Sequence, residues 1–160
     1  MKALTLYQPW ATLVAIQAKR IETRSWKTDY RGPLVIHASK KFSAEAADLC
    51  KDSPFFEALF PLFGRVNRDE YGGKDAWIMV ENIPTGCILA TCRLLNVIEI
   101  PDIRRAYPHW GTFYLPPDEP ELNFGDYIPG RYAWLLEKVE VLKTTIPCRG
   151  SLGLWECDKL

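Results

Sequence analysis

The irregular spacing of short strand-like segments most constrains the fold of this chain. Alternating apolar and polar residues, or continuous β-branched runs, predict strands at residues 3–7, 18–26, 31–39, 86–100, 131–142 and 153–157. Helix-like patterns are fewer and occupy residues 8–18, 43–51 and 53–64. So few helices do not fit repeated strand–helix–strand units around a parallel sheet. We therefore predict an α+β fold, a small and mostly antiparallel β-barrel of five to six strands with two to three flanking helices.

Local signals within the helix-like segments support these assignments. Pro9 suits the first position of the first helix, and Ser43 is a candidate N-cap for the second. The third segment carries an aromatic stripe that we expect to pack in the core: Phe55, Phe56, Leu59, Phe60 and Phe63. Residues 64–85 show the least pattern, and residues 101–130, with six of the 12 prolines, are predicted to form loops. No linker divides the chain, so we predict one domain over residues 1–160.

Composition and charge narrow the classes of partner. The chain has 20 basic and 20 acidic residues, so no overall field draws it onto duplex DNA or a membrane, and a nucleic-acid site has to be a local patch. No apolar run approaches the roughly 18 residues that cross a bilayer. The first ten residues lack the apolar core of a signal peptide, and the five scattered cysteines fit reduced thiols, so we expect a cytoplasmic protein. With only two histidines and no Cys-x-x-Cys pair, we expect no metal site and no cofactor.

One stretch, AKRIETRSW at residues 18–26, gathers several charges next to a tryptophan. Alternate side chains of a strand share a face, so Glu22, Arg24 and Trp26 are predicted to point to one side. Lys19 lies at the turn before the strand, from which it can swing towards Glu22. Two interpretations are open. The stretch is either a solvated charged face, as most charge runs are, or a ligand site that offers a cation, a carboxylate, a guanidinium and an indole.

The residues around this stretch resemble the ASCH domain (activating-signal-cointegrator homology), whose fold is PUA-like. The family signature is G-x-K-x-x-E-x-R, and this chain has Lys19, Glu22 and Arg24 at the same spacing. The segments QPW, RSW, RGPLVIHASK, PTGCILATCRLL and GLWEC extend the resemblance, in the same order, over most of the chain. Gln17 departs from the signature, which has a glycine there. Either Gln17 adopts the left-handed turn past the helix, at a cost of about 1 kcal/mol, or the turn moves to Ala18.

The resemblance implies a cleft between barrel and helices that receives RNA, another single-stranded nucleic acid or one modified nucleoside. Lysine and arginine suit phosphates, a carboxylate accepts hydrogen bonds from an exocyclic amine, and an indole offers a stacking face. We therefore predict an RNA- or nucleotide-binding domain with a cleft lined by Lys19, Glu22 and Arg24. The alternative is an enzyme with Lys19 and Glu22 as candidate catalytic residues, either a ribonuclease or a hydrolase. Some small ASCH-like proteins hydrolyse 4-acetylcytidine, but they have a threonine where this chain has Glu22, so that chemistry carries over only in part.

Besides Trp26, five residues are candidate ligand contacts in this cleft: Trp10, His37, Lys40, Lys41 and Arg149. Each has a structural alternative. Trp10 lies on the apolar face of a helix and suits core packing equally well, and a lone histidine such as His37 is often only hydrogen-bonded. The two lysines either clamp a phosphate or are solvated. Arg149 precedes a glycine-rich turn that either binds phosphate through its amides or is a plain turn.

The proline-rich segment holds a further group of stacking and charged side chains: Arg104, His109, Trp110 and Tyr114. These residues could form a stacking platform for bases. A plain loop is the simpler interpretation, because nothing in the sequence places that loop relative to the cleft.

Overall fold

The computed structural model describes residues 1–68, 74–100 and 119–160 of the chain. The strands in these ranges are β1 (Lys2–Leu6), β2 (Ile21–Arg24), β3 (Gly32–Ala38), β4 (Gly64–Arg68), β5 (Lys74–Ile78), β6 (Cys87–Glu99), β7 (Tyr132–Pro147) and β8 (Leu154–Glu156). The helices are α1 (Trp10–Ala15), α2 (Ala44–Leu49), α3 (Phe55–Phe63) and the short 3-10 turns η1 (Val80–Asn82) and η2 (Glu121–Phe124). Each strand and helix predicted from the sequence is present, with shifted ends.

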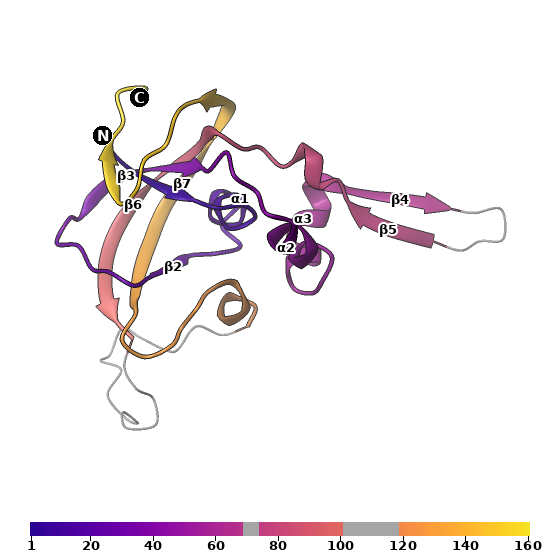
Figure 1. Ribbon diagram of the computed structural model, residues 1–160, viewed down its shortest axis with the longest axis horizontal. Coiled ribbons are helices and arrows are strands. Elements are labelled where there is room, and N and C mark those ends of the chain that lie inside the picture. The colour runs from indigo at the N-terminus through magenta and orange to yellow at the C-terminus, as the bar shows by residue number, and fades with distance from the viewer. Residues whose placement is uncertain (69–73, 101–118) are drawn as a thin grey trace.

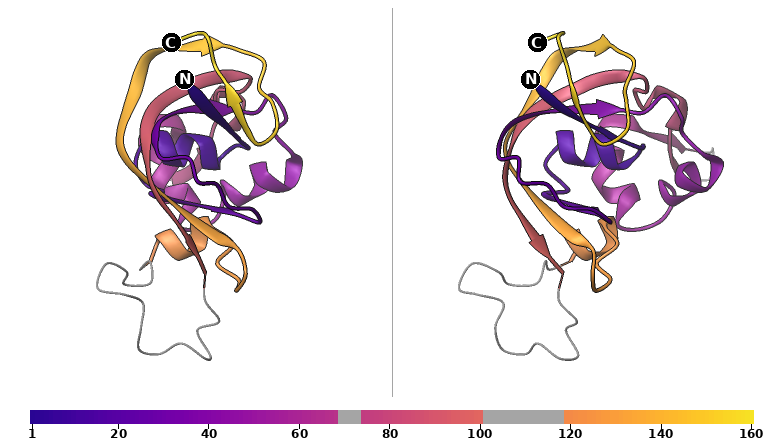
Figure 2. Two further views of the ribbon diagram at one scale, coloured as in Figure 1. Left: turned by 90° about the vertical axis from the view of Figure 1, so that its left-hand side faces the viewer. Right: turned by 60° about the vertical axis from the view of Figure 1, so that its left-hand side comes forward.

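Six of the strands form one curled sheet in the order β2-β7-β6-β3-β1-β8, and β4 pairs with β5 in a separate hairpin. β1 and β3 run parallel, and the other neighbouring pairs are antiparallel. The long strands β6 and β7 carry register shifts, which let a sheet bend, and Figure 2 shows both strands curving around α1. The predicted fold class is confirmed, because this curled sheet with its helices is consistent with a small PUA-like barrel.

Helix α1 fills the hollow of the curled sheet and connects two core clusters. On one side, buried residues of α1 pack with residues of β1, β3, β6 and β7: Leu4, Ala11, Val14, Ala15, Leu34, Ala90 and Trp134. On the other side, Leu13 belongs to a cluster with Cys50, the C-cap residue of α2, and with buried residues of α3. From the predicted aromatic stripe, Phe55 and Leu59 are buried there, and Phe56, Phe60 and Phe63 pack against the same cluster. Burial of each large apolar side chain contributes roughly 1.5–3 kcal/mol, so the stripe anchors α3 to the barrel.

The β4–β5 hairpin projects away from the curled sheet (Figure 1). Residues 65–67 and 75–77 are all exposed, including Val66 and Trp77. Side chains that lie in water on both faces need no alternation of apolar and polar residues. For that reason residues 64–85 had no readable strand pattern in the sequence.

Gln17 forms the turn by which the chain leaves α1. Its φ of 63° is left-handed, and the backbone N–H of Lys19 donates to the carbonyl of Leu13 at 3.0 Å just beyond it. Of the two predicted possibilities, the turn therefore stays at Gln17 and does not move to Ala18. This turn sets the point at which Lys19 leaves the helix.

A glycine at position 17 is expected to raise the free energy of unfolding by about 1 kcal/mol, because a residue without Cβ adopts the left-handed conformation without steric cost. The Gln17 side chain is exposed, so its loss removes no packing. Urea unfolding of the Gln17→Gly variant measures the change. In the control Ala18→Gly, whose backbone is not left-handed, glycine should instead lower stability by about 0.5–1 kcal/mol. Equal effects of the two substitutions would contradict the assignment.

Candidate functional site

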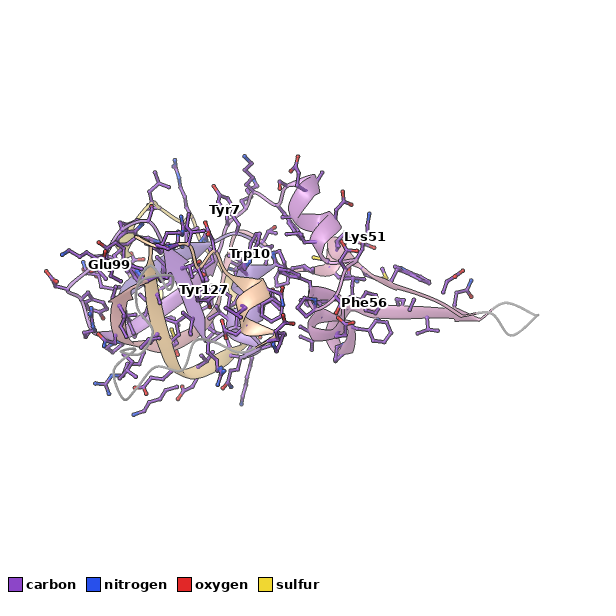
Figure 3. All side chains as sticks on the ribbon, turned by 90° about the horizontal axis from the view of Figure 1, so that it is seen from below. Tyr7, Trp10, Lys51, Phe56, Glu99 and Tyr127 are labelled. Carbon is purple, nitrogen blue, oxygen red and sulfur yellow. The ribbon has the colours of Figure 1, made fainter. Side chains whose placement is uncertain are left out.

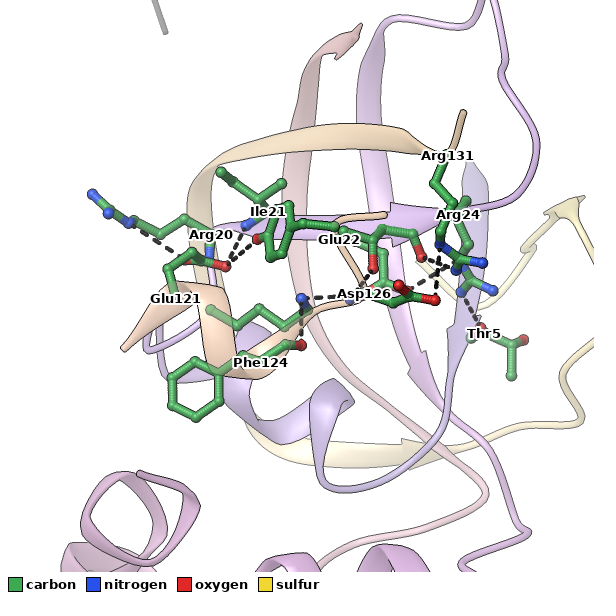
Figure 4. Close-up of polar contacts among 12 residues, drawn as sticks. Thr5, Arg20, Ile21, Glu22, Arg24, Glu121, Phe124, Asp126 and Arg131 are labelled. Carbon is green, nitrogen blue, oxygen red and sulfur yellow. Dashed lines mark hydrogen bonds and ion pairs between the residues drawn. The ribbon is translucent and has the colours of Figure 1, made fainter. Parts of the chain in front are cut away.

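Lys19, Glu22 and Arg24 form a chain of ion pairs at the start of the barrel (Figure 4). The Lys19 Nζ atom lies 3.7 Å from Glu22 Oε2, and the Arg24 Nε atom lies 3.1 Å from Glu22 Oε1. Glu22 and Arg24 share one face of β2, and Lys19 reaches them from the turn after α1, as the sequence predicts. Arg24 also donates to the backbone carbonyl of Thr5 at 2.9 Å, which ties β2 to β1 across the open side of the curled sheet.

Lys19 is enclosed by protein, with only 1% of its side chain exposed. Its ammonium donates to the carbonyl of Phe124 at 2.8 Å. Burial lowers the pKa of Lys19, and the negative charges of Glu22 and Glu121 partly oppose that shift. Lys19 lines neither of the two cavities described below. In this structure the Lys19 ammonium therefore pairs with Glu22 from the protein interior.

Glu121 is a buried carboxylate that the sequence did not indicate. Its Oε2 atom accepts from the backbone N–H of Arg20 at 2.7 Å, and its Oε1 atom accepts from that of Ile21 at 3.2 Å. The hydroxyl of Tyr127 donates to the same carboxylate at 3.3 Å. The residue stands in η2, within the segment for which the sequence showed no periodicity. Glu121 therefore fixes the start of β2 and with it the Lys19–Glu22–Arg24 chain.

A cavity of about 730 Å³, the basic cavity, opens where the ends of several strands meet the loop between β7 and β8. Five predicted site residues line it: Arg24, His37, Lys40, Lys41 and Arg149. Arg24 belongs to β2 and His37 to β3, and these strands are separated in the sheet by β7 and β6. The curl of the sheet brings both residues to one cavity. Glycines 150 and 153 form part of the same wall, and no aspartate or glutamate is among the described residues that line the cavity. Its lining is therefore suited to anionic groups.

His37 holds the loop that carries Arg149. It is 2% exposed, and its Nε2 atom is 3.0 Å from the carbonyl oxygen of Cys148. In the tautomer that carries the proton on Nε2, this nitrogen donates to the carbonyl. The His37 ring also meets Trp155 edge-to-face, with centroids 5.7 Å apart. The structural role predicted for His37 is thus present, and its edge also faces the basic cavity.

A second cavity of about 350 Å³, the aromatic–acidic cavity, lies on the other side of the Glu22–Arg24 pair. The described residues that line it are Trp10, Glu22, Thr23, Leu49, Phe55, Asn123, Phe124, Gly125 and Asp126. Figure 3 shows Trp10 between the curled sheet and the helices α2 and α3. The backbone N–H of Asp126 donates to Thr23 Oγ1 at 3.0 Å, which attaches residues 123–126 to β2. The cavity therefore combines aromatic rings with the carboxylates of Glu22 and Asp126.

The remaining predicted residues lie elsewhere. Trp26 packs edge-to-face on Trp134, with centroids 4.6 Å apart, and lines neither cavity. The four candidates of the proline-rich segment lie outside the described residues: Arg104, His109, Trp110 and Tyr114. Within the described ranges, no three His, Cys, Asp or Glu side chains are grouped so that they could hold a metal ion. In the same ranges no helix has the length and apolar character needed to cross a membrane.

Comparison with known proteins supports the resemblance seen in the sequence. The family model of the ASCH domain matches residues 4–58, which include Lys19, Glu22 and Arg24. Activating signal cointegrator 1 from Homo sapiens is 25% identical over 155 residues, and the same protein from Mus musculus is 23% identical over 155 residues. Each alignment covers 97% of this chain but 22% of the relative, so the chain spans about a fifth of the relatives' length. The resemblance seen in the sequence is confirmed, because residues 4–58 of the chain match the ASCH domain model and both relatives align over nearly the whole chain.

Proposed function

We propose that this chain binds single-stranded RNA, with backbone phosphates in the basic cavity and one nucleobase in the aromatic–acidic cavity. The ASCH domain family supports a general RNA-binding role. The observation that carries the proposal is the Glu22–Arg24 ion pair of 3.1 Å, because its two members line different cavities. The pair therefore joins a site suited to negative groups to a site suited to a base.

The chemistry of each cavity fits one part of a nucleotide. Arg24, Lys40, Lys41 and Arg149 offer cationic donors, which pair well with phosphate oxygens. In the other cavity, the Glu22 carboxylate can accept from an exocyclic amine, and the aromatic rings offer contact to a flat base. Such contacts read bases that are not paired in a duplex, which favours single-stranded RNA.

The position of Lys19 favours binding over hydrolysis. Removal of an acetyl group from 4-acetylcytidine would need the Lys19 amine beside the substrate. That amine instead donates to the Phe124 carbonyl, lies beside Glu22 and is not part of the lining of either cavity. We therefore assign Lys19 a supporting role for Glu22 within the RNA site.

Replacing Arg24 with alanine is expected to weaken binding of a short single-stranded RNA by about 1–3 kcal/mol, the range for one well-placed arginine contact. Arg24 is the cation of the basic cavity that is held in place, by Glu22 on one side and Thr5 on the other. The matched control is Arg65→Ala, because the Arg65 side chain is exposed on the β4–β5 hairpin and lines neither cavity. Fluorescence anisotropy with a labelled RNA measures both affinities, and circular dichroism checks that both variants fold.

Two further variants separate binding from a structural role of Arg24. Lys41→Ala and Arg149→Ala should each weaken binding of every RNA sequence alike, and each should reduce the slope of log affinity against log salt by about 1. If both folded variants keep the affinity and the salt slope of the parent chain, the basic cavity is not the phosphate site.

A further inference from the structure

The groups that line the aromatic–acidic cavity are unbalanced in charge. Glu22 and Asp126 contribute carboxylates, whereas no lysine or arginine is among the described residues of its lining. The cations that pair with these carboxylates lie outside it. Glu22 pairs with Arg24, which lines the basic cavity, and with the buried Lys19 at 3.7 Å. Asp126 pairs with Arg131, whose Nε atom is 3.4 Å from Asp126 Oδ2, and neither Lys19 nor Arg131 lines a cavity. A group bound here therefore meets carboxylate oxygens and no cationic side chain.

Three aromatic rings and Leu49 make up the apolar part of the same cavity. Trp10 meets Phe55 edge-to-face with centroids 6.2 Å apart, and Phe55 meets Phe124 in the same manner at 5.0 Å. The faces of aromatic rings carry negative partial charge and attract cations, indole most strongly. At about 350 Å³ the cavity is at the small end of ligand sites, which run from about 300 to 1,000 Å³. Its size suits one base, and the carboxylates and ring faces that a base would contact directly favour a positive one.

We infer that the aromatic–acidic cavity takes a nucleobase that carries a positive charge, such as adenine methylated at N1, in preference to a neutral base. The inference rests on the proposed RNA-binding function and names the class of base that the site selects. A nucleotide of this class is negative at its phosphate and positive at its base. The basic side chains of the basic cavity suit the phosphate, and the carboxylates of the aromatic–acidic cavity suit the base. The Glu22–Arg24 pair joins the two cavities, as the sugar joins phosphate and base.

Two isomeric bases test the inference. 1-Methyladenine and N6-methyladenine have the same atoms, but only the first is positively charged at neutral pH. Three labelled RNA oligonucleotides of one sequence carry adenine, 1-methyladenine or N6-methyladenine at a single central position. We expect the 1-methyladenine RNA to bind about 3- to 30-fold more tightly than the other two, the range of a cation–π contact at a partly desolvated site. The affinities are compared by anisotropy at one fixed salt concentration.

The binding results distinguish a failure of the inferred base preference from a failure of the proposed RNA binding. If the N6-methyladenine RNA binds as tightly as its isomer, or if the modification has no effect, the inference is wrong while RNA binding stands. If none of the three RNAs binds, the proposed function itself is wrong. The preference should fall towards onefold in Asp126→Asn, which retains an oxygen for the Ile128 N–H, and in Trp10→Leu. It should persist in Asp29→Asn, a matched loss of an exposed carboxylate that lines neither cavity. A preference that survives in Asp126→Asn and Trp10→Leu would place the modified base elsewhere.

Discussion

An alanine at position 121 is expected to lower the free energy of unfolding by about 3–5 kcal/mol, the range for removing one partner of a buried charged network. Glu121 is 3% exposed, and its carboxylate accepts from the backbone N–H groups of Arg20 and Ile21. Alanine would leave both donors without an acceptor, and each unpaired buried donor costs about 1–3 kcal/mol. The buried ammonium of Lys19 would also lose a stabilising charge. Urea unfolding followed by circular dichroism measures the loss.

Two controls isolate the role of the Glu121 carboxylate. Glu121→Gln keeps one oxygen that can accept from one of the two N–H groups, so its loss of stability should be smaller, about 1–3 kcal/mol. Glu119→Ala removes a nearby exposed carboxylate and should change stability by less than about 0.5 kcal/mol. If Glu121→Ala is as stable as Glu119→Ala, Glu121 does not hold the start of β2. RNA affinity should follow stability in this series, because β2 positions Glu22 and Arg24.

An alanine at position 150 is expected to lower the free energy of unfolding by about 1–3 kcal/mol, the usual cost of forcing extra volume into a packed site. A Cβ atom on Gly150 would overlap the His37 ring, at 2.5 Å from Nδ1, and would lie 2.7 Å from Thr5 Oγ1. Neither His37 nor Thr5 can move away without breaking a hydrogen bond. His37 is hydrogen-bonded to the Cys148 carbonyl, and Thr5 Oγ1 accepts from the indole of Trp155. The loop that carries Arg149 would have to move, so RNA affinity should fall together with stability.

Gly153→Ala is the matched control in the same loop. A Cβ atom at that position would meet nothing within 4 Å, so only the left-handed backbone, with a φ of +66°, opposes the substitution. Its cost should be about 1 kcal/mol of stability, without displacement of His37. Thermal unfolding and RNA anisotropy of both variants give the comparison. Equal losses of RNA affinity in the two variants would show that contact with His37 does not set the position of the loop.

The strand positions could be predicted because a half-buried strand alternates apolar and polar residues, and a fully buried one is continuously apolar. β6 and β7 follow this rule where they enclose α1 and pack in the core. The β4–β5 hairpin escaped prediction because its exposed faces leave no such pattern. The order of the strands in the sheet was not readable either, since it depends on pairing between segments such as β2 and β7, which are far apart in the chain.

Part of the candidate site was readable for an equally local reason. The period of two in β2 brings Glu22 and Arg24 to one face, and the left-handed turn at Gln17 delivers Lys19 to them. Whether each residue meets a ligand or the protein interior was not readable. Lys19 proved to be buried behind Glu22, and Trp26 packs on Trp134, because the neighbours that cover them come from distant segments.

The sequence by itself determined the α+β class, the family signature and the contacts that arise within a few residues along the chain. Only the tertiary structure decided which charges are enclosed and which face a cavity. Glu121 reaches the start of β2 across about 100 residues of chain, and Gly150 meets His37 from a separate loop. The division between a basic and an aromatic–acidic cavity likewise depends on the curl of the whole sheet. Local periodicity records only whether a side chain faces inward, and the identity of its distant partner is set by packing.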